Sequence, residues 1–212
     1  SSNGGSNWII RQTGTSTVLW SIYFFNSSTG VVGGSAGYLA RTTNGGINWT
    51  VIPTGLTTQF IQSIDFIDSD TGYAAGSQGG IIKTTNGGLN WNILSSGVSN
   101  SLYDVTFLGN TGFVAGSLGT FRKTTNGGLN WTAVSTGTNN GLQGLDFVNE
   151  STGFVVGQGN IIKRTTNAGV NWETQTSQSN NFLEKVFLTS SNSGFIVGSN
   201  GTILRSVGVP LR

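Results

Sequence analysis

Five tryptophans recur at intervals of 40 to 42 residues, and each closes an eight-residue segment of nearly constant sequence. These octets read SSNGGSNW, TTNGGINW, TTNGGLNW, TTNGGLNW again and TTNAGVNW. Between them lie short apolar runs bounded by Gly, Asn or Asp, with no useful helical periodicity. A period near 40 residues, built from short strands and Gly-rich turns, is typical of propeller blades. The sequence therefore predicts an all-β fold, a five-bladed β-propeller.

Each repeat predicts one blade of four antiparallel strands, named a to d in chain order. In the second repeat, residues 61–67, 73–76, 81–85 and 90–94 fit these four strands. We expect a single domain over residues 1–206, followed by a C-terminal tail or linker start at 207–212. The expected blades are about 17–52, 58–94, 101–134, 141–175, and 182–206 completed by 1–12.

The two ends of the sequence carry complementary parts of one repeat. The fifth repeat stops at Arg205 and Ser206, where its octet should begin, and the chain opens with an octet, Ser1–Trp8. We therefore expect the N-terminal strand to complete the last blade and close the ring by hydrogen bonds, which removes both exposed edges. The alternative is that this strand completes the fifth unit of a neighbouring molecule, by strand addition in an open assembly.

The octet has the chemistry of a tight hairpin. Asn-Gly tolerates the positive φ that such turns require, the Asn side chain can bond neighbouring backbone amides, and the Trp should pack back between blades. These structural positions are Asn3, Trp8, Asn44, Trp49, Asn86, Trp91, Asn126, Trp131, Asn167 and Trp172.

The octet resembles the Asp-box, or BNR, motif, [S/T]-x-[D/N]-x-G-x-x-W. The longer unit around it, ending in K/R-T-T-N-G-G-x-N-W, is similar to the repeats of photosystem II assembly and stability factor-like propellers of bacteria. Related units occur in sialidases and sortilin-type receptors. This resemblance implies a propeller fold over essentially the whole chain. It implies little about activity, because Asp-boxes sit on hairpins away from binding sites, and the photosystem-type factors usually have seven blades.

Composition excludes several functions. Only 8% of the residues are charged, the net charge is +2, and Cys, His and Met are absent. Disulfides, thiolate chemistry, His bases and the usual zinc or iron ligand sets are therefore excluded, and we expect no metal and no cofactor. No basic patch suggests nucleic acid, and no apolar run suggests membrane insertion. The uncharged polar surface favours a secreted, periplasmic or cell-surface protein.

Aligned strands a contain three apolar columns that should form the core. The first holds Leu19, Ile61, Leu102, Leu142 and Leu183, the second Ile22, Ile64, Val105, Leu145 and Val186, and the third Phe24, Phe66, Phe107, Phe147 and Leu188. Directly after the first column the blades differ. That variable column is the candidate ligand site, because its mix of aromatic, amide and carboxylate groups suits a carbohydrate or a peptide, although packing under the loops is the alternative. It consists of Trp20, Gln62, Tyr103, Gln143 and Glu184.

Two further sets of charged residues are candidates for a catalytic site. A basic residue precedes each octet position, and its equal place in every blade indicates strand-edge cations rather than a converging anion site; these residues are Arg41, Lys83, Lys123, Arg164 and Arg205. Asp65 and Asp146 occupy equivalent strand-a positions and could form a glycosidase pair. Their presence in only two repeats favours chance or channel lining, so we expect no enzyme.

The sequence thus favours a non-catalytic, secreted or cell-surface interaction module that binds a protein partner or self-assembles through one face. The alternatives are a lectin-like, carbohydrate-binding propeller and a structural or adhesive subunit of an extracellular assembly.

Overall fold

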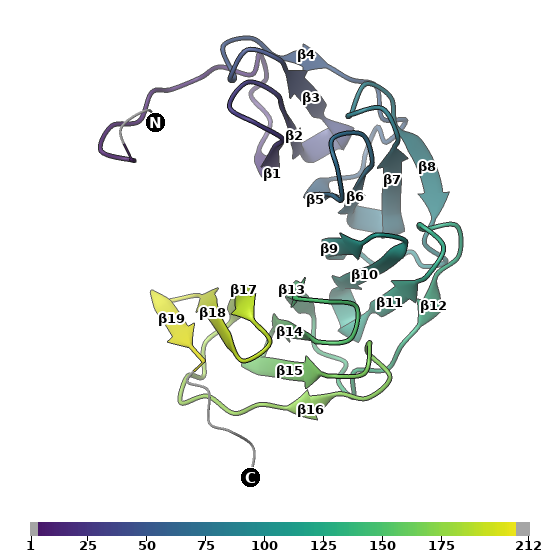
Figure 1. The fold of residues 1–212 in the computed structure, drawn as a ribbon, viewed down its shortest axis with the longest axis vertical. Coiled ribbons are helices and arrows are strands. Elements are labelled where there is room, and N and C mark those ends of the chain that lie inside the picture. The colour runs from purple at the N-terminus through teal and green to yellow at the C-terminus, as the bar shows by residue number, and fades with distance from the viewer. Residues whose placement is uncertain (1–3, 207–212) are drawn as a thin grey trace.

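The computed structural model describes residues 4–206. In this range the chain forms five antiparallel sheets that follow one another along an arc (Figure 1). Each sheet is a meander, since its neighbouring strands are consecutive in sequence. The strands are β1 (Leu19–Phe24), β2 (Gly30–Gly34), β3 (Leu39–Thr42) and β4 (Thr50–Val51) in the first blade; β5 (Ile61–Phe66), β6 (Gly72–Gly76), β7 (Gly80–Thr84) and β8 (Asn92–Ser95) in the second; β9 (Leu102–Leu108), β10 (Thr111–Gly116), β11 (Phe121–Thr124) and β12 (Thr132–Ala133) in the third; β13 (Leu142–Phe147), β14 (Gly153–Gly157), β15 (Ile161–Thr165) and β16 (Glu173–Thr174) in the fourth; and β17 (Leu183–Ser190), β18 (Ser193–Gly198) and β19 (Thr202–Arg205) in the fifth.

Short 3₁₀ turns connect strands b and c in the first three blades. They are η1 (Ser35–Gly37), η2 (Ser77–Gly79) and η3 (Ser117–Gly119). The central residue of each turn is not glycine yet has a positive φ, 56° at Ala36 and at Gln78 and 54° at Leu118. The polar and apolar side chains at these turns therefore stand on a backbone that is held in the left-handed region.

The hydrophobic core lies between blades rather than within one. Four buried clusters each combine side chains of two successive blades. Two of them contain a parallel aromatic pair: Tyr73 stacks on Phe107 with ring centroids 3.4 Å apart, and Phe113 stacks on Phe147 at 3.8 Å. Because each blade is stabilised by the next one, a blade at either end of the arc has one partner fewer.

The structure does not show the predicted ring closure. The fifth sheet contains only β17, β18 and β19, and residues 7–18 include no strand. The arc is open between β1 and the fifth blade, and the N-terminal segment lies apart from β19 (Figure 1). The physical reason is that the inner strands contact one another in the order β1, β5, β9, β13, β17, and this curvature leaves β1 and β17 apart.

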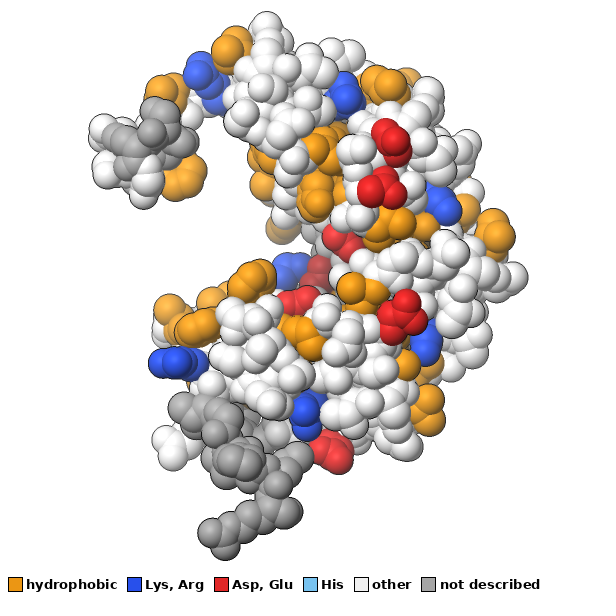
Figure 2. Space-filling view, viewed as in Figure 1, with side chains coloured by type: hydrophobic (Ala, Val, Ile, Leu, Met, Phe, Trp, Pro, Cys, Tyr) orange, Lys and Arg blue, Asp and Glu red, His pale blue; other side chains and the backbone are white. Residues whose placement is uncertain are grey.

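Some residues predicted to be in the core are exposed because they lie at the open ends of the arc. Ile22 is 61% exposed whereas its equivalent Ile64 is 7% exposed, and Phe24 is 40% exposed whereas Phe66 is 6% exposed. Leu19, the first-blade member of the first column, is also exposed. Figure 2 shows hydrophobic side chains on both sides of the gap. Their sequence pattern is that of core, but no neighbouring blade covers them.

The predicted packing of the octet tryptophans differs along the chain. Trp91 is buried, and Trp49, Trp131 and Trp172 are half-buried. Each of these four meets, edge to face, the phenylalanine of the third apolar column in its own blade; the pairs are Phe24–Trp49, Phe66–Trp91, Phe107–Trp131 and Phe147–Trp172. The predicted packing is not shown for Trp8, which is 81% exposed because no blade surrounds it in the open arc. Asn3 and the predicted tail 207–212 lie outside the described residues.

Candidate functional site

The predicted site residues all occupy one special position, the β-bulge of the innermost strand. In the second blade Ile61 pairs with Gly76 and Ser63 with Ala75, so the intervening Gln62 is the extra residue. The other four blades show the same register shift, which falls at Trp20, Tyr103, Gln143 and Glu184. A bulge turns a side chain away from the regular pleat, and bulges are common beside binding sites.

The bulge residues are accessible to different degrees. Trp20 is about half exposed, and its indole N–H donates to the Ser35 hydroxyl at 3.1 Å. Gln62, Tyr103 and Gln143 are half-buried and Glu184 is exposed. No hydrogen bond joins any two of the five in the described range, so they line one rim without forming a preassembled cluster. Whether they bind a ligand stays a prediction.

The b–c turns lie at the same end of the blades as the bulges. Strand b runs antiparallel to strand a, so the start of β5 pairs with the end of β6, where η2 begins. We call this end the mouth, defined by the five bulge residues and the b–c turns. The turns present a different side chain in each of the first three blades, namely Ala36, Gln78 and Leu118. The mouth is therefore the end at which the repeats diverge.

The opposite end carries the Asp-box turns, and here the blades agree. The Thr84 hydroxyl donates to Asn86 Oδ1 and accepts the Gly88 N–H, both at 3.0 Å, and Asn86 Oδ1 accepts the Asn90 N–H at 3.0 Å. The same three bonds recur in the turns that begin at Thr42, Thr124 and Thr165. These side chains satisfy the backbone of a tight turn and are not free to bind a ligand.

Three of the basic residues before the octets donate hydrogen bonds from one blade to the next. Arg41 Nε donates to the Gly87 carbonyl at 2.8 Å, and Lys83 Nζ donates to the Gly127 carbonyl at 3.2 Å. Lys123 Nζ reaches the carbonyl of Ala168, which occupies the equivalent Asp-box position, at 3.1 Å. Each cation points into a different interface, so they form no common anion site.

Arg164 belongs to the same series but has no Asp-box to reach. Its guanidinium stands 6.0 Å from the centre of the Phe154 ring, and it donates no hydrogen bond to any residue of the described range. The octet that would follow in the fifth blade is missing from that sheet. Arg164 thus lacks the Asp-box carbonyl that its equivalents bind, because the fifth sheet of the open arc contains no Asp-box turn.

Aspartate side chains also link the inner strands of successive blades by hydrogen bonds, which the sequence did not predict. Asp65 Oδ2 accepts the backbone N–H of Phe107 in the next blade at 2.7 Å, and Asp146 Oδ2 accepts that of Leu188 at 2.6 Å. Burial raises the pKa of Asp65 to about 6, against the opposing effect of its hydrogen bonds. Burial raises the pKa of Asp146 as well. The only signal in the sequence was that both residues occupy the same repeat position.

Asp104 is the most connected of the inner carboxylates. It accepts the Ser63 hydroxyl at 2.7 Å and the Leu145 N–H at 3.0 Å, and it forms an ion pair of 2.9 Å with Lys185. This ion pair links the third blade to the fifth. Between them, Gly144 on strand β13 of the fourth blade lies against the main chain of Glu184 and Lys185. A Cβ on Gly144 would lie 2.8 Å from the Glu184 carbonyl oxygen and from Lys185 Cα. Glycine at this position therefore permits the close approach of β17.

The described residues hold no group of three or more His, Cys, Asp or Glu that could bind a metal ion. None of the helices described is long and apolar enough to cross a membrane. The inner carboxylates Asp65, Asp104 and Asp146 are engaged as hydrogen-bond acceptors between blades, and Arg41, Lys83 and Lys123 are engaged at the Asp-boxes. What remains open for recognition is the variable mouth.

Comparisons with known proteins agree with this geometry. The sequence profile of the family described as photosynthesis system II assembly factor YCF48 matches residues 52–140 and 91–180. A search among curated proteins found no significant match.

Solved propellers share the fold. A structure of YCF48 bound to D1 peptide superposes with a TM-score of 0.73 at 19% identity, over 92% of this chain and 65% of that chain. The WD40 β-propeller domain of Doa1 gives 0.73 at 14% identity, over 91% and 66%. The GH74 xyloglucanase from Xanthomonas campestris gives 0.73 at 12% identity, over 94% and 37%. This chain thus spans less than two thirds of the YCF48 chain in that complex. Structural similarity at these sequence identities shows the propeller fold alone. The sequence profile, however, covers more than half of the 212 residues. This protein therefore belongs to the photosynthesis system II assembly factor YCF48 family.

Proposed function

We propose that this protein is a non-catalytic propeller module that binds a segment of a protein partner at its mouth. The observation that carries this proposal is the contrast between the two ends of the blades. The Asp-box end repeats the same hydrogen bonds in blade after blade, whereas the bulge residues vary among Trp, Gln, Tyr and Glu, with Gln in two of the five blades, and the b–c turns differ in each of the first three blades. A single composite site needs such unequal residues, whereas repeated glycan pockets would need equal ones.

Two relatives of the fold support a protein partner. One is the YCF48 structure, whose name states that it holds a D1 peptide, and the other is the WD40 domain of Doa1. The family to which this chain belongs is that of an assembly factor, a class of protein that works by binding other proteins.

The absence of catalysis is also part of the proposal. A retaining or inverting hydrolase needs two carboxyl groups free to face the substrate. Asp65 and Asp146, the candidate pair, each accept a backbone N–H from the neighbouring blade. Breaking these bonds for chemistry would also break contacts between blades.

The test is selection of binders from a random dodecapeptide display library, followed by variants. We expect peptides whose affinity falls about tenfold or more in Trp20→Ala and Tyr103→Ala. Leu129→Ala is the matched control, because Leu129 is an exposed hydrophobic residue in the third Asp-box. A library that yields no binder would overturn the proposal, and hits on a glycan array would replace it with the lectin-like alternative.

We further propose that the N-terminal octet completes the fifth blade and covers both open ends of the arc. Gly4 and Gly5 have φ values of 67° and 90°, close to the 66° and 81° of Gly87 and Gly88 in the second Asp-box. The Trp8 ring lies 3.9 Å from the Cβ position of Gly5, as Trp91 lies 3.8 Å from that of Gly88. Gly4 and Gly5 therefore have the φ values, and Trp8 the ring position, of an Asp-box turn.

The exposed residues of the two ends match in kind. Phe195 on β18 occupies the position of Tyr73 and Phe113, and Phe24 on β1 occupies that of Phe107 and Phe147. Those inner pairs are parallel stacks, whereas Phe24 and Phe195 are both 40% exposed. Closure would stack Phe195 on Phe24 and would give the free edge of β19 a partner strand.

Closure within one molecule and strand exchange between molecules produce species of different mass. The first gives a monomer in dilute solution, which we expect, and the second gives an open-ended series of oligomers. Such a series would favour the structural or adhesive alternative. We also propose a secreted, periplasmic or cell-surface location, supported by the low content of charged residues, and fractionation of cells that produce the natural protein would test it.

A further inference from the structure

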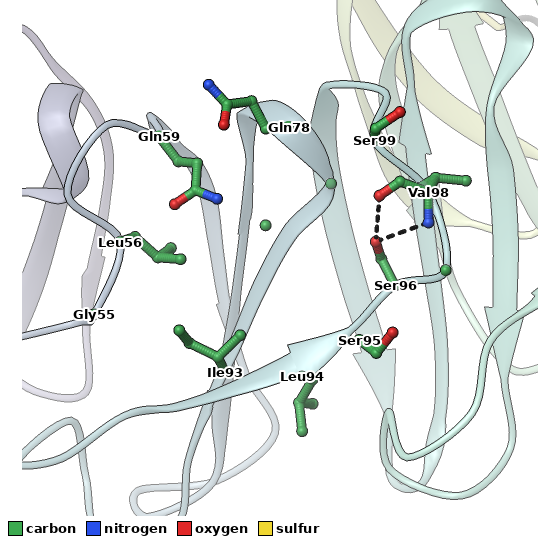
Figure 3. A pocket seen from close by; sticks show the side chains of 13 residues that line it. Gly55, Leu56, Gln59, Gln78, Ile93, Leu94, Ser95, Ser96, Val98 and Ser99 are labelled. Carbon is green, nitrogen blue, oxygen red and sulfur yellow. Dashed lines mark hydrogen bonds between the residues drawn. The ribbon is translucent and has the colours of Figure 1, made fainter.

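A groove of about 560 Å³ opens in the second blade, beside the connection from the first (Figure 3). We call it the blade 2 groove. Gln59 and Leu56 stand on one side of it, and Ile93 projects from β8 below (Figure 3). Gly80 is among the lining residues. The lining contains no charged and no aromatic residue. Its size is within the range of ordinary ligand sites.

At one position of the groove the second blade has glycine where other blades have a larger residue. Gly80 directly follows η2, where Tyr38 follows η1 and Thr120 follows η3, and Thr202 holds the equivalent place in the fifth blade. Gly80 has φ and ψ of −62° and 124°, close to the −59° and 120° of Thr120. Glycine is thus not required by the backbone here, and its effect is to leave the space of a side chain empty.

The same departure leaves an amide without its usual partner. In the third blade Asn100 Nδ2 donates to the Thr120 hydroxyl at 2.8 Å, and in the fifth Asn181 Nδ2 donates to the Thr202 hydroxyl at 2.6 Å. Gln59 occupies this position in the second blade and faces Gly80, which has no hydroxyl. Among the described residues the side-chain amides of Gln59 and Gln78 have no hydrogen-bond partner, although both line the groove.

We infer that the blade 2 groove binds an uncharged, extended peptide segment. A carboxamide both donates and accepts, which complements the alternating N–H and C=O groups of an extended chain. The aliphatic floor of Leu56 and Ile93 accommodates a small aliphatic side chain. A charged group would enter without a counter-charge, and a sugar ring would find no aromatic face on which to stack. This inference rests on the proposed function and adds a second, neutral subsite near the mouth.

Gly80→Thr is the decisive variant, because it installs the residue that the third and fifth blades use. A Cβ on Gly80 would lie 3.2 Å from the Ser77 carbonyl oxygen, 3.6 Å from Leu56 Cδ1 and 3.9 Å from Gln59 Cδ. The threonine would therefore occupy the part of the groove between Leu56 and Gln59 and give Gln59 a hydroxyl partner while the fold is kept. Gln59→Leu removes the amide without closing the groove. Ile161→Thr, at the same repeat position of the fourth blade, is the matched control.

The measurement is NMR on isotope-labelled full-length chain, with the peptide acetyl-Ala-Val-Ala-amide as the probe and cellobiose as the sugar probe. We expect the peptide to shift the side-chain NH₂ signals of Gln59 and Gln78, with affinity at least about tenfold weaker in Gly80→Thr and Gln59→Leu and unchanged in Ile161→Thr. No shift at Gln59, a shift that survives in Gly80→Thr, or a response to cellobiose instead would overturn the inference. A peptide footprint confined to Trp20 and Tyr103 would overturn this inference yet leave the proposed function standing. Failure of the display library, in contrast, would remove the proposed function.

Discussion

The carboxylate of Asp65 on β5 accepts the backbone N–H of Phe107 on β9 at 2.7 Å, so an ionisable side chain of one blade holds the main chain of the next. Asp65 is nevertheless largely removed from water, and this burial raises its pKa from 3.8 to about 6. The folded protein thus favours the protonated carboxyl. The contribution of Asp65 to stability is fully present below about pH 4 and is lost as the pH rises through about 6.

Asp65→Asn should therefore make the protein more stable at neutral pH. The asparagine oxygen can still accept the Phe107 N–H, but it carries no charge to be buried. We expect the free energy of unfolding at pH 7 to rise by up to about 3 kcal/mol, and its decline between about pH 4 and 7 to become shallower. Urea unfolding at several pH values measures both effects. Equal pH profiles for the two proteins would contradict the assigned pKa.

Ala168→Gly should stabilise the fourth Asp-box. Ala168 has a φ of 60° at a position where Gly45, Gly87 and Gly127 have 66° to 68°. The Cβ of a non-glycine residue is strained in this region, so removing it should raise stability by about 1 kcal/mol. Gly87→Ala is the reciprocal control and should destabilise, because its Cβ would also lie 3.0 Å from the Ser69 carbonyl oxygen. Thermal melts of the two variants should move in opposite directions.

Gly144→Ala should weaken the contact between the fourth and fifth blades. The added Cβ would meet main-chain atoms of Glu184 and Lys185 at 2.8 Å, and backbone cannot turn aside as a side chain can. We expect a loss of about 1–3 kcal/mol, together with weakening of the Asp104–Lys185 ion pair. Lys185→Ala separates the two effects, since the Lys185 side chain is half exposed and its ion pair alone should contribute less than about 1 kcal/mol. A Gly144→Ala loss no larger than that of Lys185→Ala would refute the steric explanation.

Most features formed within one blade could be predicted from the sequence, whereas features formed between blades could not. The octets and the alternation of strand a are local, so the five antiparallel sheets and the variable column of candidate site residues could be found from the repeat. The β-bulge at that column could not, because it appears only in the pairing of strands a and b. Asp65 and Phe107 are 42 residues apart, and their bond depends on how far one blade is displaced against the next, which no local pattern encodes.

The burial of apolar residues shows the same limit. Ile22 and Ile64 occupy identical positions in their repeats, yet Ile64 is covered by its neighbours and Ile22 is not. Burial in a repeat protein is set by the adjacent repeat as much as by the residue itself. The blade 2 groove was missed for a different reason. Gly80 and Gln59 are each unremarkable in sequence, and only the Asn100–Thr120 bond of the third blade shows what they lack.

Lys83 and Arg164 occupy equivalent positions in their blades, and replacing each by methionine tests how the arc is completed. Lys83→Met removes the bond from Nζ to the Gly127 carbonyl and the contact of Nζ with the Tyr73 ring at 5.1 Å, and should cost about 1–2 kcal/mol. Arg164→Met removes no hydrogen bond that the open arc contains. If the N-terminal octet completes the fifth blade, however, Gly4 takes the place of Gly87 and Gly127, and its carbonyl becomes the acceptor for Arg164.

We therefore expect Arg164→Met to cost about as much as Lys83→Met in the full chain. Deletion of residues 1–8 should abolish the cost of Arg164→Met and leave that of Lys83→Met unchanged, since only the first depends on the octet. Chemical unfolding of the four combinations measures this coupling, and the mass of the dilute protein tells closure in one molecule from exchange between two. An Arg164→Met variant as stable as the parent, beside a destabilised Lys83→Met, would mean that the octet does not complete the fifth blade and that its open edge is left for another partner.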